Sequence, residues 1–408
     1  MNILYWLIIG IVIAEFAYDL LLNILNIKAS KNPIPAVLNG LYDDEKYKTQ
    51  QAYFRDNKKI SFISSTLGTI ITLGFFAFGG FAWLDDYVRT ISDNEIIKTL
   101  LFFGAIGFIS WLISLPIDIY DTFVIEERYG FNKTTPKTYI LDTLKGGLLT
   151  ILFGGGILSL VVWIYSIIPE WFWLIAWATI SIVTIFIQYF YSTLIVPLFN
   201  KQTPLEAGEL RDAIEAFAHK AGFKLNNISV IDGSKRTTHS NAYFTGFGSK
   251  KRVVLYDTLI EQLNTDEIVG VLAHEIGHYK HHHIIKGLIT GLITSLITLY
   301  LFSLIINNPT IAQAAGCDSP SFYVNLSVFS FIYSPLNIVL GIIGNIASRR
   351  NERQADAFAK KYGMGKAQSS ALKKISAQSL SNLTPHPFVV FTEYSHPTLA
   401  QRVTVLEE

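Results

Sequence analysis

The stretch Val271-Leu272-Ala273-His274-Glu275-Ile276-Gly277-His278 determines how the rest of this chain is interpreted. It contains the pattern His-Glu-x-x-His. Helical residues four apart lie about 40° apart around the axis and about 6 Å apart along it. His274 and His278 can therefore present two imidazoles to one tetrahedral zinc ion, with Glu275 beside them as a candidate general base for water. A pattern this short also occurs by chance, so the interpretation needs a third ligand and a suitable structural context.

The composition indicates a membrane protein. Half of the 408 residues are hydrophobic, 13% are aromatic and 16% are charged, whereas soluble domains are about 25% charged. The net charge of +1 gives no indication of a nucleic-acid partner, and we expect none. A single cysteine, Cys317, excludes a disulfide within the chain and a zinc site built from several cysteines.

Seven apolar runs are long enough to cross a hydrocarbon core of about 30 Å as helices. They lie at residues 3–26, 60–84, 99–122, 146–168, 172–195, 284–306 and 325–347. The first run has no basic segment before it and no small-residue cleavage site, which favours a retained helix over a signal peptide. Its Glu15 and Asp19 share one face, which either lines a polar interior or lies near the helix end.

The basic residues predict the orientation of these helices. Lys and Arg number seven in 27–59, four in 125–145 and nine after residue 347, against two in 85–98 and none in 167–171 or 307–324. By the positive-inside rule the N-terminus lies outside and the C-terminus lies in the cytoplasm.

The same pattern divides the chain into regions. We expect helices one to five in 1–195 with cytoplasmic loops at 27–59 and 125–145, a cytoplasmic metalloprotease segment in 196–283, helices six and seven in 284–347, and a cytoplasmic catalytic segment in 348–408.

The cytoplasmic metalloprotease segment has mixed helix and strand signals. An amphipathic helix is predicted from Pro204 to Gly222, and strands are predicted at 228–232, 241–244 and 252–256, forming a small antiparallel sheet. Asn264 and Glu267 resemble a capping box that begins the motif helix. We expect this helix to run on into the sixth span, with the metal near the cytoplasmic membrane boundary.

A third metal ligand is expected to be a carboxylate. The best candidate follows the seventh span, where a helix would place Glu352 and Asp356 on one face. Glu352 can bind the metal and Asp356 can accept a hydrogen bond from a ligating imidazole. The alternative is a solvated charge cluster beside the membrane. Because Glu352 and His278 would emerge on the same side of the membrane, the metal site is favoured.

At this point the chain resembles a known family, the integral-membrane zinc CaaX prenyl proteases of type I, which are HExxH metalloendopeptidases. The resemblance covers nearly the whole chain, and the order and spacing of its motifs make it specific. Besides the seven spans and His-Glu-x-x-His, the matching motifs are Glu127-Arg128-Tyr129-Gly130-Phe131-Asn132, Pro197-Leu198-Phe199-Asn200, Ser240-Asn241-Ala242-Tyr243-Phe244, Arg349-x-x-Glu352-x-x-Ala355-Asp356 and Ser395-His396-Pro397-Thr398-Leu399-x-x-Arg402. The resemblance implies a mainly α, polytopic membrane fold: seven transmembrane helices enclosing a chamber, with a small cytoplasmic α+β zinc-metalloprotease domain.

The resemblance also implies roles for the motif residues. His274, His278 and Glu352 correspond to the ligands of one zinc ion per chain, and Glu275 corresponds to the general base. The three histidines 281–283 that follow are expected at the surface or the membrane interface, not as a second metal site.

The resemblance further implies that the C-terminal motif at 395–402 and the strand upstream of the His-Glu-x-x-His motif bind the substrate. His396 and Arg402 would hold the substrate and stabilise the oxyanion; the alternative is an ordinary helix start with Arg402 on a solvent face. Asn241, Ala242 and Tyr243 would form an edge strand that pairs with an extended peptide; the alternative is a strand without a binding role.

The expected function is zinc-dependent removal of C-terminal residues from prenylated or other membrane-associated peptides. The expected partners are a peptide or protein substrate, lipidated or not, and membrane lipid.

Two alternatives remain. One is a membrane quality-control metalloprotease. The other is a transporter or scaffold with structural zinc, in which Glu15, Asp19, Asp118 and Asp121 would line a pathway. The lack of long eukaryotic insertions favours a bacterial inner membrane over the endoplasmic reticulum.

Overall fold

The computed structural model describes residues 2–225, 227–245 and 252–408. It confirms the expected fold class: a mostly helical chain with seven apolar helical spans and a small sheet in the soluble part. The spans are Ile3–Ala29, Asp44–Ala77, Glu95–Glu126, Pro136–Ile167, Phe172–Phe199, His283–Ser303 and Phe322–Lys361. Only 0% to 17% of each apolar window is buried inside the protein. Such exposed apolar surface is unfavourable in water, which is consistent with a lipid environment.

The spans are built from helices that begin at side-chain caps where the sequence supplies Asn, Asp, Thr or Ser. The helices are α1 (Ile3–Ala29), α2 (Asp44–Ala77), α4 (Glu95–Tyr120), α5 (Pro136–Leu149), α6 (Gly156–Ile167), α7 (Phe172–Phe190), α8 (Val196–Phe199), α12 (His283–Ser303) and α14 (Phe322–Lys361). Short π-helical segments continue three of the spans, namely η2 (Asp121–Glu126), η3 (Thr150–Gly155) and η4 (Tyr191–Ile195).

Two short helices, α3 (Gly80–Ile91) and α13 (Pro309–Ala314), pack against the first residues of α1 and α14 at one end of the molecule. The Tyr323 hydroxyl donates to Asp85 Oδ1 at 2.5 Å, and Arg89 Nε donates to the same oxygen at 2.9 Å. Tyr323 and Asp85 are both buried. This polar cluster fixes the first turns of α14.

The sheet has the order β1-β2-β4-β3. Its strands are β1 (Gln202–Pro204), β2 (Asn227–Ile231), β3 (Ala242–Thr245) and β4 (Arg252–Tyr256). The predicted strands are confirmed, but the antiparallel sheet is only partly right because β2 and β4 are parallel. The chain after β2 passes through the 3-10 turn η5 (Gly233–Lys235) and β3, and it therefore returns to the starting end of β2 before β4 begins. This route leaves β3 at the edge of the sheet.

Helix α11 (Thr265–Lys280) carries the His-Glu-x-x-His motif. The other helices are α9 (Glu209–Lys220), α10 (Asp257–Gln262), α15 (Gly365–Gln378), α16 (Pro387–Glu393) and α17 (Leu399–Glu407), with the 3-10 turn η1 (Ala36–Leu38) between α1 and α2. Of these, α9 and α15 pack against α11, whereas α16 packs against α14 and α1. The apolar face of α11, with Leu272 and Ile276, packs into a core shared with α9, β4, α14 and α15. Helix α9 begins later than predicted because Pro204 belongs to β1.

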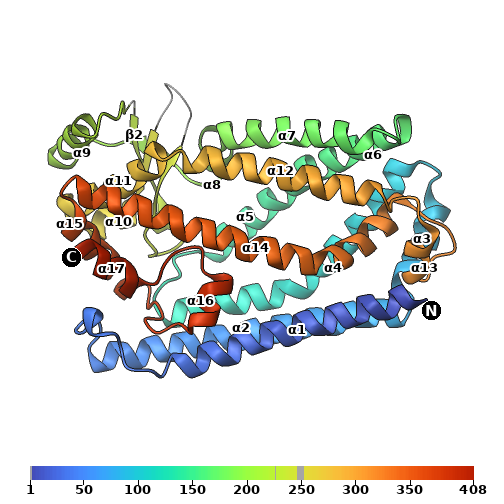
Figure 1. Cartoon of the computed structure of the whole chain (residues 1–408), viewed down its shortest axis with the longest axis horizontal. Helices are drawn as coiled ribbons and strands as arrows, with labels where there is room; N and C mark the ends of the chain where they lie inside the picture. The colour runs from blue at the N-terminus through green and yellow to red at the C-terminus, as the bar shows by residue number, and fades with distance from the viewer. Residues whose placement is uncertain (1, 226, 246–251) are drawn as a thin grey trace.

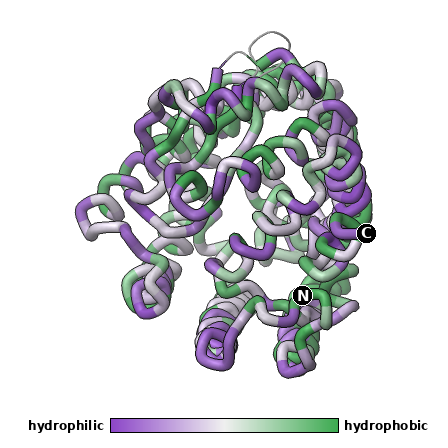
Figure 2. Tube along the Cα trace, turned by 90° about the vertical axis from the view of Figure 1, so that its left-hand side faces the viewer, coloured by the Kyte–Doolittle hydropathy of each residue, from purple (hydrophilic) through white to green (hydrophobic). Residues whose placement is uncertain are grey.

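In Figure 1 this soluble part lies at the left, the long helices extend to the right, and α3 and α13 lie at the far end. Figure 2 views the molecule from its left-hand side and shows long helices nearly end-on, arranged around the periphery and not in one flat layer.

Candidate metal centre

The motif helix α11 begins at the predicted capping box. Asn264 accepts from the backbone N–H of Glu267, and the Glu267 carboxylate accepts from the backbone N–H of Asn264. The helix then places His274 and His278 one turn apart, with their Nε2 atoms 3.1 Å from each other. Both imidazoles therefore present the same nitrogen to one point in space.

Helix α11 does not continue into the sixth span, and that prediction is wrong. It ends at Lys280, His282 adopts a left-handed conformation with φ 58° and ψ 31°, and α12 begins at His283. This conformation costs an L-residue other than glycine about 1–2 kcal/mol. The break changes the chain direction between the motif and the membrane span.

The third predicted ligand comes from α14 and meets the two histidines. Glu352 Oε1 lies 3.1 Å from His278 Nε2, and Glu352 Oε2 lies 3.4 Å from His274 Nε2. One ligand atom from each of these residues lies within 4.8 Å of the others. Oε2 is buried and accepts no hydrogen bond in the described part of the chain. A divalent cation would satisfy this oxygen, so the residues fit a metal site.

Gly277 allows α11 and α14 to approach closely enough to bring these ligands together. A Cβ atom at this position would lie 2.9 Å from Ala355 Cα and 3.1 Å from Phe358 Cβ. The first of these distances is shorter than real Cβ contacts. The second variable position of the motif is therefore occupied by the one residue that has no side chain.

Asp356 and Arg402 form the environment of His274. Asp356 Oδ1 lies 2.8 Å from His274 Nδ1, and Arg402 donates to both Asp356 oxygens at 2.8 and 2.7 Å. Burial alone would lower the pKa of His274, but its contacts with Asp356 and Glu352 outweigh burial and raise the pKa to about 9. The contact with Asp356 directs the imidazole proton to Nδ1 and leaves Nε2 for a metal.

Glu275 follows the first histidine and is half-buried beside the ligands. Burial raises the pKa of its carboxyl group above the usual value, while the neighbouring histidines oppose this shift. A carboxylate with a raised pKa is a stronger proton acceptor near neutral pH, which suits a general base.

The structure brings both predicted C-terminal residues to the site. His396 Nε2 lies 3.4 Å from Glu352 Oε1, on the loop between α16 and α17. Arg402 lies on α17 with its side chain largely buried, so the alternative of a solvent-facing arginine is wrong. Although the His396 side chain is 59% exposed, partial desolvation by its neighbours lowers its pKa, and the nearby Glu352 carboxylate opposes this shift.

Arg349 supports the site through contacts that could not be predicted from the sequence. Its guanidinium donates to the carbonyl oxygens of Val390, Phe391 and Tyr394 at the end of α16. It thereby links α14, three residues before Glu352, to the segment that carries His396. The motif included Arg349, but spacing alone gave no partner for it.

The upstream strand lies as expected at a sheet edge. Ala242 and Tyr243 belong to β3 and Asn241 directly precedes it, and β3 pairs with β4 on one side only among the described strands. Strand β3 also contacts α11. Residues 246–251, which follow β3, lie outside the described residues.

The three histidines after the motif do not behave alike. His281 and His282 are exposed as expected, but His283 is buried, and the prediction is wrong for this residue. His283 Nδ1 lies 2.9 Å from His278 Nδ1. The interpretation assumed an unbroken helix, in which His283 would point elsewhere.

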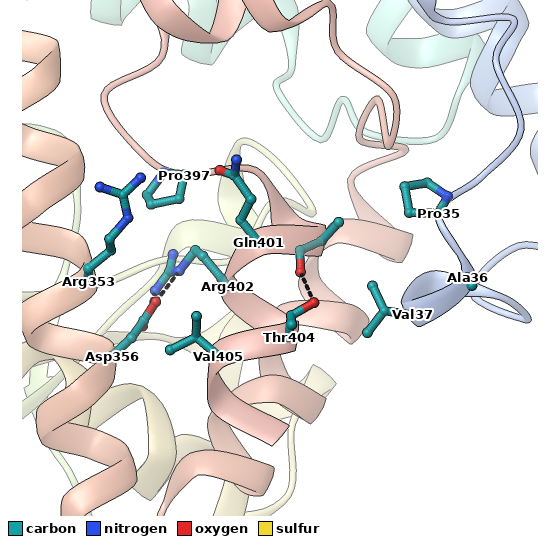
Figure 3. Close-up of a pocket in the computed structure, with 11 residues that line it drawn as sticks. Pro35, Ala36, Val37, Arg353, Asp356, Pro397, Gln401, Arg402, Thr404 and Val405 are labelled. Atoms are coloured by element: carbon teal, nitrogen blue, oxygen red, sulfur yellow. Dashed lines mark hydrogen bonds and ion pairs between the residues drawn. The ribbon is translucent and has the colours of Figure 1, made fainter. Parts of the chain in front are cut away.

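A pocket of about 490 Å³ lies between η1 and α17, beside the pair formed by Arg402 and Asp356 (Figure 3). Pro35, Ala36 and Val37 form one wall. The hydrogen-bonded guanidinium and carboxylate contribute to the opposite side of the pocket.

Fold and site together define a class: a polytopic membrane metalloprotease whose candidate metal ligands come from α11 and α14. Comparisons with known proteins agree. The model described as CAAX prenyl protease N-terminal, five membrane helices, matches residues 23–201, and the model of peptidase family M48 matches residues 204–408. The chain belongs to peptidase family M48, together with the CAAX prenyl proteases.

Individual relatives match along almost the whole chain. CAAX prenyl protease 1 of Saccharomyces cerevisiae is 35% identical over 100% of this chain and 96% of its own. The CAAX prenyl protease 1 homolog of Arabidopsis thaliana is 34% identical over 98% of this chain and 96% of its own. The CAAX prenyl protease 1 homolog of Homo sapiens is 34% identical over 92% of this chain and 88% of its own. The crystal structure of S. mikatae Ste24p matches with a TM-score of 0.94 at 34% identity over 100% of both chains. These relatives are eukaryotic and give no support to the expectation of a bacterial inner membrane.

Proposed function

We propose that this protein is a zinc-dependent endopeptidase of the CaaX prenyl protease type. It removes C-terminal residues from prenylated or otherwise membrane-associated peptides. The observation that carries the proposal is the convergence of His274, His278 and Glu352, with a buried Glu352 oxygen that accepts no hydrogen bond from the described residues. The names of the relatives support the substrate class.

The three ligands would hold one zinc ion per chain. When bound, zinc supplies a Lewis acid for a peptide carbonyl and makes water more acidic. Glu275 takes the proton of the attacking water and passes it to the leaving amine. Asp356 keeps the proton of His274 on Nδ1 through their 2.8 Å contact, so that Nε2 stays available.

Substrate binding is assigned to the edge strand and the C-terminal motif. Asn241, Ala242 and Tyr243 present a sheet edge to which an extended peptide can add as a further strand. Both C-terminal residues lie beside Glu352: His396 Nε2 is 3.4 Å from its Oε1, and Arg402 Nη1 is 3.6 Å from its Oε2. From there they hold the substrate backbone and stabilise charge that develops on the carbonyl oxygen.

The membrane spans would accommodate the apolar part of the substrate. We propose that the seven helices enclose a chamber that opens to the metal centre at its cytoplasmic end, with the N-terminus outside. The distribution of Lys and Arg supports this orientation.

The test compares a farnesylated CaaX peptide with the same peptide lacking the lipid, using the purified full-length protein in detergent. We expect cleavage of the lipidated peptide, loss of activity with a chelator and recovery when zinc is added back. Equal cleavage of both peptides would remove prenyl specificity and favour a quality-control protease. No zinc-dependent cleavage of either peptide would refute the proposed function.

A further inference from the structure

His283 occupies a position that only the break between α11 and α12 makes possible. Helix α11 ends at Lys280, and the left-handed residue His282 turns the chain before α12 begins. The turn brings the ring of His283 to 5.0 Å from the ring of His278, measured between centroids. His283 is buried, although its two preceding histidines are exposed.

Both ring nitrogens of His283 have partners. Nδ1 lies 2.9 Å from His278 Nδ1, and Nε2 lies 2.9 Å from Gln354 Oε1 on α14. Gln354 follows Glu352 by two residues, so the chain of contacts connects one candidate ligand to the helix that supplies another. His283 therefore joins the beginning of α12 to both elements of the metal centre.

The proton positions in this chain follow from the donor and acceptor rules for imidazole. The Nε2 atom of His278 faces His274 and Glu352, so the His278 proton belongs on Nδ1. His283 Nδ1 must then accept that hydrogen bond, and its own proton must be on Nε2. There it donates to the amide oxygen of Gln354, an atom that can only accept.

We infer that His283 is a positioning residue that fixes the ring orientation and tautomer of His278, so that Nε2 is the atom offered to the metal. The inference rests on the proposed zinc site. His283 would support His278 as Asp356 supports His274. Each of the two contacts the Nδ1 atom of its histidine and leaves Nε2 directed at the site. Such partners commonly change metal affinity by 10- to 100-fold.

The two partners differ in charge, and their surroundings explain the difference. Asp356 is an anion paired with Arg402. His283 is the first residue of the sixth span, where a further buried charge would be costly. A neutral imidazole backed by an amide gives the required acceptor without adding a charge.

The experiment measures zinc affinity of the purified protein by competition with a chromophoric chelator. His283→Leu fills the buried position with an apolar side chain and removes the acceptor, and we expect zinc affinity to fall 10- to 100-fold. His283→Asn places an amide oxygen near the former Nδ1 position and should restore most of the lost affinity. His282→Asn removes an adjacent exposed imidazole, tolerates the left-handed conformation, and should bind zinc as the unmodified protein does.

Two further measurements separate a local effect from misfolding. The melting temperature of the metal-free variants reports folding. Gln354→Leu leaves His283 in place but removes the acceptor for its Nε2 proton, and it should also reduce zinc affinity.

Unchanged zinc affinity in both His283→Leu and Gln354→Leu would overturn the inference, as would a loss that His283→Asn fails to restore. Binding of more than one zinc ion, lost in His283→Leu, would overturn it in favour of a second metal. Failure of the unmodified protein to bind zinc would instead refute the proposed function.

Discussion

Glu275 is the residue at which the proposed chemistry is most directly tested. Replacing it by Gln keeps size and burial but removes the proton acceptor. We expect kcat to fall by about 10²- to 10⁴-fold, with zinc content and melting temperature unchanged because Glu275 is not a ligand. The measurement is steady-state cleavage of the farnesylated peptide, with metal analysis of the same sample. Wild-type turnover by Glu275→Gln would exclude Glu275 as the base.

At the residue scale the sequence predicted which three side chains would converge, but not all of the contacts that support them. His274, His278 and Glu352 were recognisable as candidate ligands because zinc chemistry limits ligand types and the helix sets their spacing. His283 was assigned to the surface because three consecutive histidines contain no glycine or proline that signals a break. A left-handed histidine depends on tertiary contacts, which a sequence pattern does not contain.

Gly277 sets the distance between α11 and α14. Replacing it by Ala adds a methyl group where a Cβ would lie 2.9 Å from Ala355 Cα, a backbone atom that cannot move alone. The helices must separate, and Glu352 moves away from the histidines. We expect zinc affinity and peptide cleavage to fall together, although Ala favours helices more than Gly does.

Gly287 on α12 provides the matched control, since a Cβ there would have no atom within 4 Å. Gly287→Ala should leave zinc binding unchanged. If Gly277→Ala also bound zinc normally, close helix approach would not be what assembles the site.

Glu267 joins α11 to α15 and gives a pH-dependent prediction. Burial opposes ionisation, but hydrogen bonds from Lys374, Ser370 and the Asn264 backbone lower the pKa of Glu267 below 4.5. A carboxylate whose pKa is lower in the folded state than in the unfolded state stabilises the protein at pH values above the unfolded-state pKa. This stabilisation is lost as the pH falls through the folded-state pKa. We expect Glu267→Gln to lower the free energy of unfolding by about 1–3 kcal/mol at pH 7, with the difference shrinking below pH 4.5.

The comparison is thermal unfolding in detergent across pH. Asp266 lies beside Glu267 in the first turn of α11 and is exposed. Asp266→Asn should therefore have a much smaller effect. A pH-independent difference for Glu267→Gln would show that the charge is not responsible.

At the element scale, spans and strands were predicted because their patterns are local. Each of the seven apolar runs overlaps one helical span, and the three strands lie within one residue of the expected ranges. The bounds of the second span are wrong, because its helix is Asp44–Ala77 and residues 80–84 belong to α3. The parallel pairing of β2 and β4 was missed because it depends on where the intervening chain returns. The short strand β1 was missed because three residues show no alternation.

The orientation of the whole molecule can be tested with its single cysteine. Cys317 is buried, and burial raises the pKa of its thiol to about 12, so it should react slowly with maleimides. In a Cys317→Ser background, Asp318→Cys should be labelled by a membrane-impermeant maleimide from outside intact cells, whereas Lys31→Cys should be labelled only after permeabilisation. The reverse pattern would invert the proposed topology.

Helix α14 couples the two ends of the molecule, and this has a consequence for lipid composition. It contains 40 residues, about 60 Å of helix. Tyr323 and Asp85 hold one end, and Glu352 reaches the metal centre near the other. Bilayers thinner or thicker than the spans make helices tilt, and tilting α14 against α11 would displace Glu352 from the histidines. Cleavage rates in vesicles of graded acyl-chain length should therefore pass through a maximum, which makes hydrophobic thickness a determinant of activity.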